Sequence, residues 1–261
     1  MILRLRVRWA LLLAFVSAIA ASPCTACTAA AAPSDEATTS STSAPAVSPA
    51  ARKSLLRSIT ASFDATAASR YLFQGIDYSD GRSVLQPNLV ANLGPFSAVC
   101  WANYQVDLGD INEVDLSLKA TRSVGPLSVS PGYTVLRYPN RVGWDPSQEV
   151  FADLSVAAPL SPSLSIHEDF DAGDGVYATL ALSYPLGSAL SVGTNVFYQR
   201  HYYGMTGVPS VELKVSGAFQ HSGMTLTPSL SRFATRNNGD FTGGARVPQG
   251  WLIAVNIVPA R

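Results

Sequence analysis

Carboxylates are the side chains of this sequence best suited to bind a ligand, and four of them fall close together. They are Glu168, Asp169, Asp171 and Asp174, with Gly173 among them. Carboxylate oxygens supported by turn glycines could hold Ca²⁺ or bridge lipid headgroups. The spacing lacks the third ligand and the downstream Glu of an EF-hand loop. We therefore predict a solvated acidic loop and no metal site.

The three histidines, His167, His201 and His221, are the side chains that could act as general bases near neutral pH. His221 lies in a short turn and His201 begins a long connection, which predicts opposite ends of the fold for these two. The sequence contains no Gly-x-Ser-x-Gly motif, phosphate-binding loop or His-Glu-x-x-His motif. Outer-membrane hydrolases can build Ser–His sites on β-barrels, but the spacing here does not argue for such a pair. We predict no catalytic residue, no cofactor and no enzymatic activity.

These polar residues belong to segments in which apolar and polar side chains alternate. In residues 113–121, Val114, Leu116 and Leu118 alternate with polar residues, and residues 210–233 alternate on both sides of a short turn. Side chains along a strand point to opposite faces, and a tilted strand of about ten residues crosses a bilayer. Twelve such segments occur, at 59–66, 85–93, 96–104, 113–121, 127–135, 149–156, 163–170, 176–184, 190–200, 210–220, 224–231 and 251–257.

The connections between these segments alternate in length. Short turns occupy 94–95, 125–126, 159–162, 185–188 and 221–223, and longer polar connections occupy 67–83, 105–112, 138–147, 171–175, 201–209 and 234–250. Short turns at one rim and long loops at the other are typical of an outer-membrane barrel, which closes without free edges. We predict an all-β chain that forms a single antiparallel up-and-down transmembrane β-barrel of about 12 strands, with periplasmic termini.

A soluble lipocalin-like barrel is the alternative architecture, and it would place its apolar face inside around a ligand. The polar face of this chain is rich in Ser, Thr and Asn, with few charges per strand. That composition fits a wet lumen better than a surface exposed to bulk water. Aromatic residues near both ends of the segments resemble interfacial girdles, although an ordinary β-sandwich also carries aromatics. We therefore expect Val211, Leu213 and Val215 to face lipid.

Charged residues on the polar face would then line the lumen. The predicted residues are Asp64, Glu113, Asp115, Lys119, Glu149, Asp153, Glu212 and Lys214. If the lumen is open, the excess of acids would favour cations. If it is closed, the same residues would form an internal network that plugs the barrel, and a barrel of this size is compatible with either. We also expect Arg70 to pair with Asp64 near the mouth.

One stretch resembles a known family. Residues 68–76, Ala-Ser-Arg-Tyr-Leu-Phe-Gln-Gly-Ile, are similar to the Ser-x-Tyr-x-Phe-Arg-Gly-x signature of the TorF-type porins, a group of poorly characterised bacterial outer-membrane barrels. Residues 85–87, 113–116 and 170–173 also resemble the family, and the similarity spans about 60–184. The resemblance implies a barrel with a channel role and brings no catalytic residues. The chain departs from the family pattern at Gln74, where Arg is usual. Its C-terminus, Val-Pro-Ala-Arg, lacks the final aromatic residue typical of outer-membrane barrels.

The N-terminal region predicts export. Residues 1–20 combine three arginines, an apolar core and an Ala18-Ile19-Ala20 cleavage site, as in a secretory signal peptide, with a signal anchor as the alternative. Residues 21–54 are rich in Ala, Ser, Thr and Pro, which predicts a disordered tail. Cys24 and Cys27 near the cleavage region could be lipidated or joined by a disulfide. The barrel would then occupy 55–261.

Composition and pattern together predict the function class. The chain has no net charge and a pI near 6.8, which argues against nucleic-acid binding. We expect a barrel in the bacterial outer membrane, surrounded by its lipid, that lets small hydrophilic solutes or ions diffuse passively. The alternative is a non-conducting barrel that acts through its extracellular loops, and a periplasmic lipocalin-like carrier is a third reading.

Overall fold

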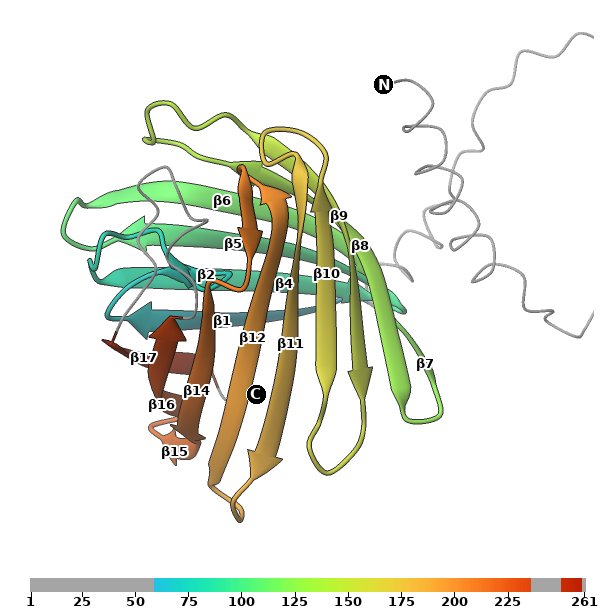
Figure 1. Ribbon diagram of the computed structural model, residues 1–261. Helices are drawn as coiled ribbons and strands as arrows, with labels where there is room; N and C mark the ends of the chain where they lie inside the picture. Colours follow the sequence, from blue (N-terminus) through green and yellow to red (C-terminus); the bar gives the residue numbers. More distant parts are fainter. Residues whose placement is uncertain (1–58, 236–249, 260–261) are drawn as a thin grey trace, which may run out of the picture. The chain divides into compact units, whose positions relative to one another are not determined.

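The computed structural model describes residues 59–235 and 250–259, and these residues are all β-structure and connections (Figure 1). The described part of the chain contains no helix long and apolar enough to cross a membrane. The signal peptide predicted over 1–20, the tail predicted over 21–54 and both N-terminal cysteines lie outside the described residues.

Twelve long strands form the sheet. They are β1 (Thr60–Ala68), β4 (Val84–Leu93), β5 (Phe96–Gln105), β6 (Asp110–Ala120), β8 (Leu127–Arg137), β9 (Ser147–Val156), β10 (Ser163–Asp169), β11 (Gly175–Pro185), β12 (Leu190–Tyr202), β14 (Ser210–Gly217), β16 (Met224–Thr235) and β17 (Gly250–Pro259). Three short strands continue or extend this sheet: β7 (Arg122–Val124) pairs with β8, β13 (Met205–Gly207) with β12, and β15 (Phe219–His221) with β16. The remaining pair, β2 (Leu72–Phe73) and β3 (Ile76–Asp77), forms a separate small hairpin.

The sheet closes on itself. Each long strand pairs antiparallel with the next one along the chain, and β17 pairs with β1 in the register Ala65↔Ile257. Closure satisfies the backbone donors and acceptors of every long strand, which is the condition for crossing hydrocarbon. The structure is therefore a single antiparallel up-and-down barrel of twelve strands, and this prediction is confirmed.

Turn chemistry explains the short connections. Gly94 has a φ of 57° and is followed by Pro95, which fits a type II′ hairpin turn between β4 and β5. Ser222 and Gly223 have φ values of 49° and 73°, as a type I′ turn requires at both central positions. These turns match the right-handed twist of the strands, so the two-residue links fix the register of the hairpins on either side.

The outer surface of the barrel is apolar and the inner surface is polar. On β14, Leu213 is 60% exposed and Val215 is 48% exposed, while the intervening side of the strand carries Glu212, which is 6% exposed. Outward apolar side chains recur around the barrel, among them Leu89, Leu116, Leu118, Leu180, Trp251 and Ile253. A continuous apolar surface of this kind belongs in lipid. The lipocalin-like layout, with the apolar face inside, is wrong for this chain.

Candidate functional site in the barrel lumen

The connection between β1 and β4 enters the barrel. Within it, residues 71–79 carry β2 and β3, and we call this segment the lumen hairpin. Its turn residues Gln74 and Gly75 have φ values of 50° and 76°, as a type I′ turn demands. A glutamine tolerates this left-handed conformation at some cost, and glycine adopts it freely.

The tip of the lumen hairpin reaches the wall opposite its own base. Thr179 Oγ1 on β11 donates a hydrogen bond to Gln74 Oε1 at 2.9 Å, and Gln199 Nε2 on β12 donates to the Gln74 carbonyl at 3.3 Å. Ser210 Oγ on β14 donates to the carbonyl of Gly75 at 3.2 Å. Around the closed ring of long strands β11 lies opposite β4, with β12 and β14 between β11 and the β16–β17 side, so the hairpin crosses the lumen to reach β11.

Aromatic rings hold the hairpin in place. The Phe73 ring lies 5.3 Å from that of Tyr177 on β11, and the Tyr71 ring lies 5.5 Å from that of Trp101 on β5. Ile76 packs with Tyr177, Tyr202 and Met205 in the most deeply buried cluster, which therefore lies inside the barrel. Burial of these rings supplies most of the favourable free energy of docking.

The sequence analysis missed this element, although signals for it were present. Apolar residues flank Gln74-Gly75 on both sides, Leu72-Phe73 before it and Ile76 after it, which is a hairpin pattern. Val99 and Trp101 interrupt the polar face of residues 96–104, and large inward side chains need something to pack against. The structure supplies that partner, because Trp101 contacts Tyr71 of the lumen hairpin.

Carboxylates surround the hairpin. Glu113 on β6 forms a side-chain hydrogen bond with Tyr71. Burial, together with the nearby carboxylates of Glu113 and Asp115, raises the pKa of Tyr71 well above its ordinary value. One carboxylate oxygen of Asp115 is buried with no hydrogen-bond partner among the described residues. The lumen at this level combines phenols with carboxyl groups.

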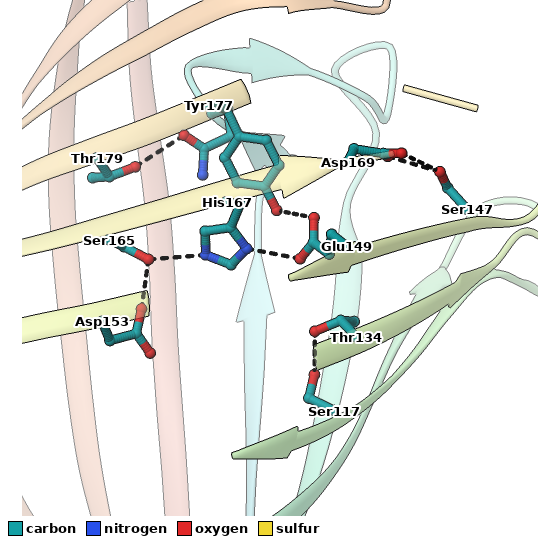
Figure 2. A network of polar contacts seen from close by, with 11 residues as sticks. Ser117, Thr134, Ser147, Glu149, Asp153, Ser165, His167, Asp169, Tyr177 and Thr179 are labelled. Atoms are coloured by element: carbon teal, nitrogen blue, oxygen red, sulfur yellow. Dashed lines mark hydrogen bonds and ion pairs between the residues drawn. The ribbon is translucent and has the colours of Figure 1, made fainter. Parts of the chain in front are cut away.

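A continuous polar chain runs along β9 and β10 (Figure 2). Glu149 accepts hydrogen bonds from Tyr177 Oη at 2.5 Å and contacts His167 Nδ1 at 2.7 Å. His167 Nε2 lies 2.9 Å from Ser165 Oγ, which donates to Asp153 at 2.6 Å. The His167 ring is stacked between Phe151 and Tyr177, with centroids 5.0 and 4.5 Å away.

The hydrogen-bond directions in this row of polar side chains follow from its contacts. Ser165 has one hydroxyl proton, and it donates that proton to Asp153, so His167 Nε2 must donate to Ser165. His167 Nδ1 must also donate if Glu149 is ionised. His167 then bridges the two carboxylates, contacting Glu149 directly and Asp153 through Ser165.

The order Ser165, His167, Glu149 matches that of a catalytic triad, but the chemistry differs. A nucleophilic serine must give its proton to the histidine, and Ser165 gives its proton to Asp153. The strand that carries Ser165 is hydrogen-bonded on both sides, to β9 and β11, so its backbone N–H groups are used in the ladder and are not free to form an oxyanion hole. The arrangement ties β9, β10 and β11 together in the lumen wall.

The four acidic residues at 168–174 do not form one solvated loop. Glu168 and Asp169 belong to β10. Asp169 is only 1% exposed, and its two carboxylate oxygens each lie 2.7 Å from Ser147 Oγ, which donates to them. Asp171 lies at the rim and accepts from Gln148, and Asp174 is exposed. The prediction of a single solvated loop is wrong at Asp169, whose inward position follows from strand alternation. Within the described ranges, no three His, Cys, Asp or Glu side chains gather as a metal site requires.

The predicted lumen residues lie as follows. Asp64 points inward and accepts from Asn88 Nδ2 at 2.9 Å and Asn256 Nδ2 at 3.0 Å, on the strands that flank β1. Glu212 accepts from Asn195 Nδ2 at 2.6 Å. By strand register, Glu113, Asp115, Lys119, Glu149, Asp153 and Lys214 also belong to the inner face. Lys214 is exposed there, while Lys119 is half-buried.

The expected pair of Asp64 with Arg70 does not form. Arg70 Nη1 lies 3.6 Å from Asp77 Oδ2, within the same connection. Asp77 also accepts from the backbone N–H groups of Ser79 at 2.9 Å and Gly81 at 3.1 Å. Arg70 therefore stabilises the base of the lumen hairpin, and the amides of neighbouring strands satisfy Asp64.

Comparison with known proteins identifies the fold. No protein-family model and no curated protein matches the sequence. A solved KdgM porin superposes with a TM-score of 0.52 at 9% sequence identity, over 77% of this chain and 99% of that chain. A KdgM porin in complex with disordered oligogalacturonate superposes with a TM-score of 0.51 at 10% identity, with the same coverage. The chain therefore has the fold of a KdgM-like porin barrel.

Proposed function

We propose that this protein is an outer-membrane porin through which small hydrophilic solutes or ions diffuse passively. The observation that carries the proposal is the closed barrel with an apolar outer surface and a polar, charged inner surface. A lipid-facing exterior and a hydrophilic interior are what a pore through a bilayer requires. The porin-like fold and the sequence resemblance to TorF-type porins over 60–184 support the same role, and we place the chain near that family.

The lumen charges favour cations over anions. The inner face carries the carboxylic acids Asp64, Glu113, Asp115, Glu149, Asp153, Asp169 and Glu212. The cationic side chains of the inner face and of the loops around the lumen hairpin are Arg70, Lys119, Arg141 and Lys214. Rings of acidic side chains attract cations into a pore. Oligogalacturonate, seen with one KdgM porin, is a polyanion, and this lumen would repel it. We therefore propose small cations and neutral solutes as cargo.

Planar-bilayer recording tests the porin function. Purified protein that migrates as a folded, heat-modifiable barrel on unboiled gels is added to a membrane, and boiled protein serves as the control. Discrete conductance steps from the folded sample are the expected result. If folded protein inserts but never conducts, the pore is wrong and a barrel that acts through its extracellular loops replaces it.

A further inference from the structure

We propose that the lumen hairpin, residues 71–79, is the size filter of this pore: while docked it limits passage to ions and small neutral solutes, and its release widens the lumen. The inference rests on the proposed porin function. Hydrated monovalent cations and a pentose would pass a docked hairpin, and oligosaccharides would not.

The path of the hairpin supports this role. The base of the hairpin follows β1, and its tip contacts β11, β12 and β14 on the opposite wall. A solute that moves along the barrel axis must pass beside this crossing segment. The hairpin backbone is also bonded to a third part of the barrel, because Arg141 of the β8–β9 connection donates a hydrogen bond to the carbonyl of Tyr78.

The two ends of the hairpin are held differently. At the base, Asp77 forms an ion pair with Arg70 and accepts hydrogen bonds from the backbone N–H groups of Ser79 and Gly81. At the tip, the bonds to the wall join neutral groups, and two of the three are 3.2 Å or longer. Charged hydrogen bonds are stronger than neutral ones, so the tip is the end that would detach.

Gly75 is the residue on which docking of the tip depends. A Cβ atom at this position would lie 2.4 Å from Ser210 Oγ and 2.9 Å from Phe197 Cδ2. Both distances are shorter than nonbonded atoms tolerate, so a side chain at Gly75 forces either the tip or the Ser210 and Phe197 side chains to move, and the contact between tip and wall is disrupted. Gly81, in the same connection, has the same φ of +76° but open space around its would-be Cβ.

These two glycines give a matched test. Gly75→Val adds both backbone strain and the clash with the wall, whereas Gly81→Val adds only the strain. Conductance and the permeation of a pentose and a trisaccharide are measured by bilayer recording and liposome swelling. We expect Gly75→Val to conduct at least about twice as much as the unchanged chain, because conductance follows the open cross-section, and to admit the trisaccharide. Gly81→Val should behave as the unchanged chain does.

The outcomes separate the filter from the pore. If every protein conducts with the same conductance and size limit, the filter is wrong and the porin function stands. If no protein conducts, including Gly75→Val, both are wrong. Should Gly75→Val fail to migrate as a folded barrel, Phe73→Ala replaces it, because it removes ring contacts to Tyr177 and Tyr202 without adding strain. Phe73→Ala with unchanged permeation would equally overturn the filter.

Discussion

At the scale of single residues, Ser165 is the link that joins Asp153 to His167 and Glu149 in the lumen wall. It accepts from His167 and donates to Asp153 at 2.6 Å. We predict that Ser165→Ala lowers the free energy of unfolding by about 1–3 kcal/mol, since a half-buried carboxylate loses its donor. Urea unfolding in detergent micelles measures the change. Ser183→Ala, at an exposed inward position of β11, is the control and should cost less.

The Ser165→Ala variant also tests whether Ser165, His167 and Glu149 act as a catalytic triad. If they did, replacing Ser165 would abolish hydrolytic activity. We expect neither the unchanged chain nor Ser165→Ala to hydrolyse an activated ester faster than buffer does. Turnover that disappears on replacing Ser165 would contradict the assignment of Ser165 as a donor to Asp153 in the lumen wall.

Tyrosines around the lumen hairpin predict a response to alkaline pH. Burial raises the pKa of Tyr203 to about 12, and it also raises the pKa values of Tyr71, Tyr78 and Tyr138. Their ordinary value is about 10, so the packed loops favour the neutral phenols. The stabilisation is fully present below pH 10 and is lost as the pH rises through about 12.

We therefore predict that the loops around the hairpin loosen as the pH rises above 10, before the barrel unfolds. Tyrosinate absorbance and limited proteolysis, followed in parallel with far-UV circular dichroism, measure the two events. Simultaneous loss of strand signal and loop protection would contradict the prediction, because it would mean that the loops and the barrel unfold as one unit.

At the scale of the elements, the strands were predictable and the lumen hairpin was not. Period-two alternation identified all twelve strands, because one face of each meets lipid and the other meets the lumen. Alternation also predicted that Glu212 faces inward and Leu213 faces outward. The exposed side chain of Leu213 and the buried side chain of Glu212 confirm this prediction. The path of residues 71–79 depends on contacts with strands more than a hundred positions away in sequence, such as Thr179 with Gln74. Local pattern does not contain such contacts.

The orientation of β14 makes a quantitative prediction. Leu213→Arg should lower the free energy of unfolding in lipid by about 2–4 kcal/mol, the cost of a charge on the lipid face near the midplane. Ser216→Arg should cost less, because the Ser216 hydroxyl faces inward and bonds Ser191 at 2.8 Å. Folding titrations into phospholipid vesicles measure both. Equal costs at the two positions would mean that the faces of β14 are assigned incorrectly.

At the scale of the whole molecule, closure of the barrel followed from the even number of segments and the alternating lengths of the connections. The pairing of residue 65 with residue 257 could not be read locally, since it joins the two ends of the barrel. The site was only partly predictable for a related reason. Residue type and alternation indicated the inward carboxylates, but partners such as Arg70 with Asp77 depend on how a connection folds.

The central claim is that a polar, acidic lumen inside a closed barrel conducts cations. The most direct test is the reversal potential of single channels across a KCl gradient, for folded protein in a planar bilayer. We predict a potential of the sign set by K⁺, reduced when the inward residues Asp64 and Glu212 are replaced by Asn and Gln, because two acidic groups are removed from the lumen wall. A potential of the sign set by Cl⁻, or folded protein that inserts without conducting, would contradict the account.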